Sequence, residues 1–383
     1  MKDKKNKKRT TTQHKGNEKL PLARPLCVMR EKNYAMIEKE VKTYKEGINK
    51  WRDNRYSFMS EMNTNAGITN FGKAKKNGNT YKHIIKLDKT DSYNFLGEEE
   101  ILRQVLERFD NGKAGDLKRV LTNTVASQTC CFNLFSPLKI PKYSFLADKI
   151  FSNLLNREVS ISNIEIEFTP NKSESIGDQS KIAGTDADVG VFYNYENKKG
   201  VILIEFKYIE NEFSVCSSYK NKDIKELCNK NYYNSMISKI LNSENHLNKF
   251  DCGYLKYENW NLTNKSNVFD KVKIQNQNSC PFRFSLNQLW RNMLLAEKVA
   301  EVRELDEFHF WVISPKENTF LWENKGQNNE TAFREILTIK GNEKFKSLEL
   351  DKHFISKIEN YANDKWSKEW LRKFREKYLT KTE

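Results

Sequence analysis

The sequence has little glycine and proline, 15 and 7 residues among 383, and no hydrophobic run of membrane-spanning length. The residues at its start are charged and lack the apolar stretch of a secretion signal. No G-x-x-x-x-G-K-[ST] loop occurs, which argues against an intrinsic NTP-driven motor. The five histidines are too dispersed for a histidine-based metal motif. We therefore expect a soluble, cytoplasmic protein that has no membrane partner.

Cysteine is also scarce, with an odd count of 7 and no C-x-x-C pair, which favours reduced thiols. Four cysteines nevertheless fall in or beside one segment, and four thiols can hold zinc or an iron–sulfur cluster. The intervals between them, 11, 23 and 27 residues, match no standard ligand spacing, so scattered thiols are the favoured interpretation. The four are Cys216, Cys228, Cys252 and Cys280.

Positive charge exceeds negative charge: 66 Lys and Arg residues against 51 Asp and Glu residues give a net charge of +15. Residues 1–24 are basic and unpatterned, and we expect them to form a disordered tail. The rest of the chain keeps most of the surplus, which would attract a polyanion such as nucleic acid. Ordinary solubility is the alternative explanation.

Hydrophobic periodicity predicts an α/β core between helical extensions. Residues 25–126 form a predicted N-terminal helical region, interrupted by an irregular basic connection at 63–90. After a buried segment that ends at a proline, we expect a helix, three antiparallel strands, a long insert, a helix and a fourth strand. These elements cover residues 143–155, 161–168, 188–192, 201–209, 211–282, 286–302 and 307–314, and a basic helical region, 321–383, follows.

Two of these strands carry charged residues where burial is expensive. Because side chains alternate along a strand, Glu205 and Lys207 emerge on the same face, and Asp188 opens the neighbouring strand. Carboxylates are ligands for Mg²⁺ or Mn²⁺, and a lysine can orient water and offset charge that develops on a phosphate. The pattern indicates phosphodiester hydrolysis with a metal at Asp188 and Glu205. The alternative is an edge strand whose charges face water.

This arrangement resembles the PD-(D/E)XK nuclease superfamily, whose core is αβββαβ, over about residues 127–314, within a predicted nuclease core of residues 127–320. Asp188 takes the place of the first acid, although Ala187 precedes it where the pattern has proline, and Glu205 and Lys207 stand as E-X-K. Asp186 is an alternative metal ligand. The resemblance also implies an additional carboxylate near the metal, for which Glu167 is the better candidate. Asp148, on the preceding helix, is the weaker one.

Gln288 is similar to a glutamine that some members carry on the helix after the E-X-K strand. The tyrosine usual four residues later is replaced by Asn292. Stretches around SQ, FNLFSPL and QLWRN are similar to those of a bacterial restriction-endonuclease-like group. The resemblance implies a Mg²⁺-dependent endonuclease that cuts DNA in restriction or antiviral defence. It leaves open an RNA nuclease, a non-catalytic nucleic-acid-binding module, and assembly with a second copy or a defence-system partner.

The last predicted helix carries an aromatic residue at every fourth position, which is more typical of a docking face than of a base-stacking platform. The aromatic residues are Trp366, Trp370, Phe374 and Tyr378. His309 lies within an apolar strand, and we expect it to be structural.

Overall fold

The computed structural model describes residues 51–75, 77–86, 92–110, 115–178, 184–216, 237, 258–324 and 327–379. The predicted basic tail, residues 1–24, and the first part of the predicted N-terminal helical region, residues 25–50, lie outside these ranges, as do Cys228 and Cys252. Among the described helices, none is long and apolar enough to cross a membrane.

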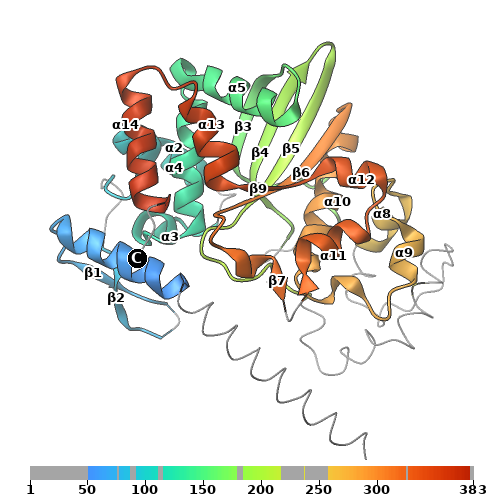
Figure 1. The fold of residues 1–383 in the computed structure, drawn as a ribbon, viewed down its shortest axis with the longest axis horizontal. Helices are drawn as coiled ribbons and strands as arrows, with labels where there is room; N and C mark the ends of the chain where they lie inside the picture. Colours follow the sequence, from blue (N-terminus) through green and yellow to red (C-terminus); the bar gives the residue numbers. More distant parts are fainter. Residues whose placement is uncertain are drawn as a thin grey trace, which may run out of the picture. The chain divides into compact units, whose positions relative to one another are not determined.

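A five-stranded mixed sheet carries the functional residues (Figure 1). Its order is β3-β4-β5-β6-β9; β3, β4 and β5 are antiparallel neighbours, whereas β6 runs parallel to both β5 and β9. The predicted antiparallel strands and the fourth strand are thereby confirmed. The strands are β3 (Ser160–Phe168), β4 (Ala187–Tyr195), β5 (Lys198–Phe206), β6 (Glu307–Ser314) and β9 (Phe345–Glu349).

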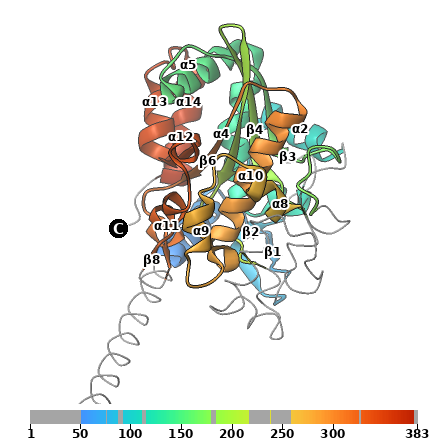
Figure 2. The same cartoon turned by 90° about the vertical axis from the view of Figure 1, so that its right-hand side faces the viewer.

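Helices cover both faces of the sheet, which explains why β5 is apolar at almost every position rather than at alternate ones (Figures 1 and 2). On one face, α4 and α5 contact the strands, and α2, α13 and α14 contribute to the same core. On the other face, α10 contacts the strands, and α8 and α11 pack against α10. The bounds are α2 (Glu98–Asp110), α3 (Leu117–Thr122), α4 (Ser127–Lys139), α5 (Ser144–Leu155), α8 (Asn259–Lys265), α9 (Lys271–Gln275), α10 (Leu286–Val302), α11 (Asn329–Glu335), α12 (Ile339–Lys344), α13 (Ser356–Glu359) and α14 (Lys365–Phe374).

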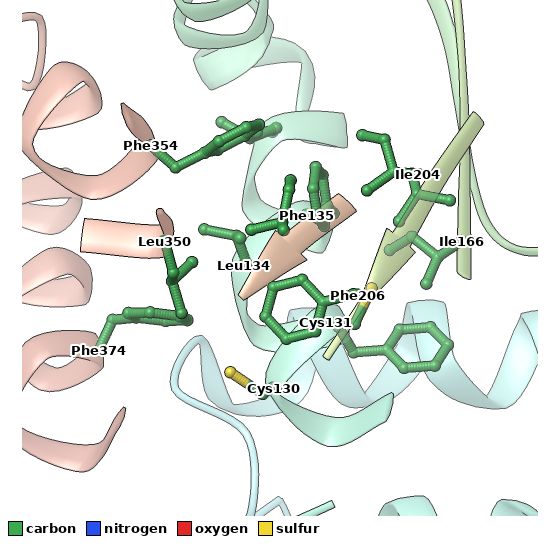
Figure 3. Packing of buried hydrophobic residues seen from close by; sticks show 14 of the residues in the cluster. Cys130, Cys131, Leu134, Phe135, Ile166, Ile204, Phe206, Leu350, Phe354 and Phe374 are labelled. Carbon is green, nitrogen blue, oxygen red and sulfur yellow. The ribbon is translucent and has the colours of Figure 1, made fainter. Parts of the chain in front are cut away.

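The core on the α4 side is built from aromatic and branched side chains (Figure 3). Phe135 of α4 is fully buried and meets Phe354 edge to face, with ring centroids 5.7 Å apart. Ile166 and Ile204 contribute from the sheet. Truncating a buried phenylalanine such as Phe135 to alanine would cost about 3–5 kcal/mol, so this core fixes α4 against the strands.

The expectation of an irregular connection over residues 63–90 was wrong. Residues 51–65 are helical, and a β-hairpin follows, with β1 (Phe71–Lys73) pairing antiparallel with β2 (Thr80–Ile85). The Asn77-Gly78 pair in the turn, where Gly78 has φ +70°, is a standard hairpin signal that the surrounding lysines and asparagines obscured.

The predicted helical region over residues 321–383 contains helices but also strands, which the prediction lacked. β9 adds a fifth strand to the sheet, and β7 (Glu323–Asn324) pairs with β8 (Gln327–Asn328). In β9, Phe345 and Leu348 are the two buried apolar residues, too few for an alternation signal. A π-helical turn, Leu350–Ile355, then leads to α13.

The aromatic stripe of the last helix faces the core, which confirms the docking interpretation. Trp370, Phe374 and Tyr378 are almost completely buried, and Trp366 is partly buried, stacked on Tyr143 at a centroid distance of 4.5 Å. α14 begins at Asp364, whose side chain accepts hydrogen bonds from two backbone amides of the first turn.

Candidate active site

The predicted acids lie at adjacent positions of three neighbouring strands. The β3–β4 register places Glu167 opposite Asp188, and the β4–β5 register places Glu205 beside Asp188. The side chain of Glu205 emerges on the sheet face that packs on α10, because Ile204 and Phe206, which alternate with it, belong to the opposite core. Strand pairing alone therefore concentrates negative charge at one end of β4 and β5.

Glu205 is the most completely bound of the acids, with 3% of its surface exposed. Its Oε1 accepts a hydrogen bond from Gln288 Nε2 over 2.7 Å and pairs with the Lys207 ammonium, while Oε2 accepts from Asn292 Nδ2 over 2.6 Å. Gln288 is itself oriented by the backbone amide of Ser214, which donates to Gln288 Oε1 over 2.8 Å. Asn292 thus contacts the acid directly.

Lys207 extends past the end of β5, where its backbone amide donates to the carbonyl of Ile313 on β6 over 2.9 Å. Its side chain is 13% exposed. Burial alone would lower the pKa of Lys207, but nearby carboxylates, foremost Glu205 and Asp188, outweigh burial and raise it above its ordinary value. The neighbouring carboxylates therefore favour the protonated, cationic form of Lys207.

Asp188 Oδ2 accepts a hydrogen bond from the backbone amide of Phe206 over 2.6 Å, which ties β4 to β5 beyond the last ladder pair. Burial and the negative charge of Glu205 raise the pKa of Asp188 well above its ordinary value, and the Lys207 ammonium opposes them. The carboxylates of the site therefore repel one another, and the Lys207 ammonium offsets part of that repulsion.

Glu167 has left-handed backbone geometry, φ +56°, which non-glycine residues rarely adopt. Its Oε2 accepts from Gln128 Nε2 of α4 over 2.9 Å, and its carbonyl accepts from Arg108. Burial raises the pKa of Glu167 despite the Gln128 hydrogen bond. Its Oε1 is buried, and no described residue donates to it.

The backbone geometry of Glu167 also changes which face of the sheet the side chains of β3 point to. Ile164 and Ile166 belong to the core on the α4 side, yet Phe168, two residues later, belongs to the core on the α10 side. Phe168 lies over Gly190, where a Cβ atom would come within 2.9 Å of the ring, so position 190 has no room for a larger residue. The positive φ at Glu167 accounts for the switch of face.

The two remaining acid candidates differ in their surroundings. Asp186 is exposed just before β4, and its charge contributes to the raised pKa of Glu167, so it lies near the site. Asp148 was a wrong candidate: it accepts a hydrogen bond from the Ile161 amide over 2.7 Å, at the opposite end of β3 from Glu167. Its side chain anchors the start of that strand instead.

Several residues of the site were missed in the sequence. The N-terminal turn of α4 supplies Gln128, which binds Glu167, and Ser127, whose hydroxyl donates to Glu210 over 2.6 Å. Glu210 adds to the raised pKa of Lys207. None of these residues stands out by spacing, although Asn292 lies four residues after Gln288, which places both side chains on one helix face.

The donor chemistry of the site fits a hard divalent cation, whose ligands are oxygens. Three carboxylates share one neighbourhood, and Glu167 Oε1 is a buried acceptor to which no described residue donates. Within the described ranges, no three His, Cys, Asp or Glu side chains stand in a ready-made metal-binding group. The oxygens of Glu205 contact Lys207 and α10 instead. Cys216 and Cys280, the two described members of the predicted cysteine site, are buried and belong to no such metal-binding group.

A family model of the PD-(D/E)XK nuclease superfamily matches residues 49–380. Comparisons with curated proteins and with solved structures gave no match. The matched residues include the complete five-stranded sheet, the three acids and Lys207. Members of this superfamily typically use a divalent metal and act on nucleic acid. Because the match extends over most of the sequence, the chain belongs to the PD-(D/E)XK nuclease superfamily.

Proposed function

We propose that the protein is a Mg²⁺- or Mn²⁺-dependent endonuclease that hydrolyses phosphodiester bonds in DNA, with a role in restriction or defence against foreign DNA. One observation carries the proposal: Glu205 pairs with Lys207 and lies beside Asp188, at the place where Glu167 offers an oxygen without a described donor. A charge cluster of this kind would be expensive to keep if it served only folding.

Asp188 and Glu205 would hold the cation, with Glu167 and Asp186 as further carboxylates. When bound, the metal polarises phosphate oxygens and lowers the pKa of an attacking water. Lys207 keeps its proton and places a positive charge where negative charge develops on the phosphate. Gln288 and Asn292 act as positioning residues, because they fix both oxygens of Glu205 from α10.

The overall charge of +15 supports a polyanionic substrate, and exposed lysines supply nonspecific phosphate contacts. The chemistry of the site does not depend on the sugar, so RNA is the principal rival substrate. A non-catalytic nucleic-acid-binding protein is the second rival.

The test incubates the full chain with supercoiled plasmid, single-stranded DNA and RNA, each with Mg²⁺, Mn²⁺ or EDTA. Asp188→Asn and Lys207→Ala are compared with wild type, and Lys149→Ala, an exposed lysine on α5, is the matched control. We expect plasmid cleavage by wild type and Lys149→Ala in either metal, and loss of at least about 100-fold in both site variants.

Equal cleavage by wild type and both site variants would refute the assignment of the site. Binding of DNA without cleavage by any protein would favour the binding module. Cleavage confined to RNA would replace the proposed substrate while leaving the roles of the residues intact.

A further inference from the structure

A large open cavity lies outside the active site, between the helical residues 51–65 and the β1–β2 hairpin. Its volume is about 1070 Å³, which is ample for a nucleotide with its phosphate. The nuclease site described above uses none of the residues that line it.

Three aromatic rings lie in series along this cavity, each tilted relative to its neighbour. The ring centroids of Tyr56 and His83 are 4.4 Å apart, and those of Tyr81 and His83 are 5.3 Å apart. Arg52 lies over Tyr56, 5.5 Å from the ring centroid, and donates two hydrogen bonds to its hydroxyl. Burial, with Arg52 nearby, lowers the pKa of His83 to about 4, so the imidazole is a neutral flat ring at pH 7.

The hairpin side of the cavity is basic and rich in hydrogen-bonding groups, whereas Asp53 and Glu61 line the helical side beside Arg52. Between Ala66 and Lys86 the sequence has five lysines and no acid. Lys73, Lys75, Lys82 and Lys86 are exposed in the structure. Amide and hydroxyl side chains, among them Asn65, Asn77, Asn123 and Ser60, line the cavity. Aromatic faces, hydrogen-bonding groups and neighbouring lysines together match an unpaired base attached to a phosphate backbone.

The cavity is joined to the active site by a short segment of chain. The carbonyl of His83 accepts hydrogen bonds from the backbone amide and the hydroxyl of Thr124, over 3.1 and 3.0 Å. Asn123 lines the cavity, and Gln128, five residues later, binds the Glu167 carboxylate. Five residues span at most about 18 Å, so one strand several nucleotides long could contact both places.

We propose that this cavity binds an unpaired stretch of the substrate strand, stacking a base on the Tyr81–His83 rings while the hairpin lysines bind its phosphates. The proposal rests on the proposed nuclease function for the statement that the bound strand is the one cleaved. The binding itself needs neither metal nor cleavage. The shared chemistry is a nucleobase with its phosphate, which single-stranded DNA and RNA both provide.

The test measures binding of the full chain to fluorescein-labelled oligonucleotides by anisotropy in EDTA, so that no cleavage occurs. Single-stranded DNA, single-stranded RNA and a duplex of the same sequence are compared. The variants are Tyr81→Ala, Tyr81→Phe and Lys82→Ala, and Lys149→Ala on α5 is the charge control. Circular dichroism establishes that each variant is folded.

We expect wild type to bind a single strand more tightly than the duplex, and Tyr81→Ala to weaken single-strand binding about 10-fold. Tyr81→Phe, which keeps the ring, should bind like wild type. Lys82→Ala should reduce the slope of log affinity against log salt by about 0.7, whereas Lys149→Ala should leave it unchanged. If the DNA and RNA strands differ in affinity, the tighter one identifies the sugar that the cavity accepts.

Preference for the duplex, an unchanged affinity in Tyr81→Ala, or an equal loss of slope in Lys82→Ala and Lys149→Ala would each overturn the proposal. These outcomes are independent of cleavage. If the plasmid assay fails while the Tyr81 effect holds, the cavity stands and the nuclease assignment falls. If Tyr81→Ala binds normally while Lys207→Ala loses cleavage, the nuclease assignment stands and the cavity proposal falls.

Discussion

Asn292 Nδ2 donates to Glu205 Oε2 over 2.6 Å, one helical turn after Gln288, which donates to the other oxygen over 2.7 Å. A single helix face therefore fixes the orientation of the acid from across the sheet interface. Two charge-assisted hydrogen bonds from adjacent turns leave the carboxylate little freedom to rotate.

The first prediction concerns Asn292→Ala. The change removes the donor to Glu205 Oε2, and losing a hydrogen bond to a charged group costs about 1.5–3 kcal/mol. If that loss falls on the transition state, cleavage should slow about 10- to 100-fold. Plasmid cleavage under single-turnover conditions measures it, with Glu301→Gln on the exposed end of α10 as the control. Unchanged cleavage in a folded Asn292→Ala protein would contradict the positioning role.

The second prediction concerns Glu167→Asn. Asparagine tolerates the left-handed backbone better than glutamate does, and the change also removes a buried carboxylate. We expect the free energy of unfolding to rise by about 1 kcal/mol while cleavage falls. Urea unfolding and plasmid cleavage measure the two effects. A less stable variant would mean that the Gln128 hydrogen bond outweighs the strain at this position.

The third prediction concerns metal binding without turnover. Mg²⁺ or Mn²⁺ should raise the melting temperature of wild type, because a ligand at 100 times its Kd stabilises the folded state by about 2.7 kcal/mol. Asp188→Asn should show a much smaller rise, and EDTA should reverse the rise in wild type. Differential scanning fluorimetry makes the measurement. An equal rise in both proteins would place the cation elsewhere.

The fourth prediction concerns Lys377, whose ammonium donates to the carbonyl and the side-chain oxygen of Asn94 over 3.0 and 2.9 Å. Burial lowers the pKa of Lys377 to about 7, whereas an unfolded lysine titrates near about 10.4. Between these values the unfolded chain binds more protons, so this group makes the free energy of unfolding rise with pH. The slope is at most about 1.4 kcal/mol per pH unit.

Urea unfolding of wild type and Lys377→Met at pH 7, 8 and 9 tests this slope. In the variant the side-chain oxygen of Asn94 loses its Lys377 donor, whereas the carbonyl of Asn94 keeps a hydrogen bond from Asn133. Only the difference in slope bears on the prediction. Parallel curves would show that Lys377 stays charged in the folded protein.

The sequence was sufficient to predict the strands around Asp188, Glu205 and Lys207, because alternation and an apolar strand are local signals. It was insufficient for Gln128 and Asn292, because their roles depend on which helix packs on which face. The same lack of tertiary information made Asp148 a false candidate. Its carboxylate accepts a hydrogen bond from a backbone amide at the end of β3 that lies away from Glu167. The β1–β2 hairpin was missed although its Asn77-Gly78 turn was visible.

The arrangement around Glu205 has one more consequence. Both of its oxygens already accept hydrogen bonds or ion-pair contacts, so any cation that binds there competes with the protein's own donors. Removing one of those donors would strengthen cation binding, because the cation would no longer compete with it. The same change would leave the orientation of the Glu205 carboxylate less well fixed. Affinity for the metal and speed of cleavage should therefore change in opposite directions across a series of α10 variants, which makes tight binding a sign of an impaired enzyme.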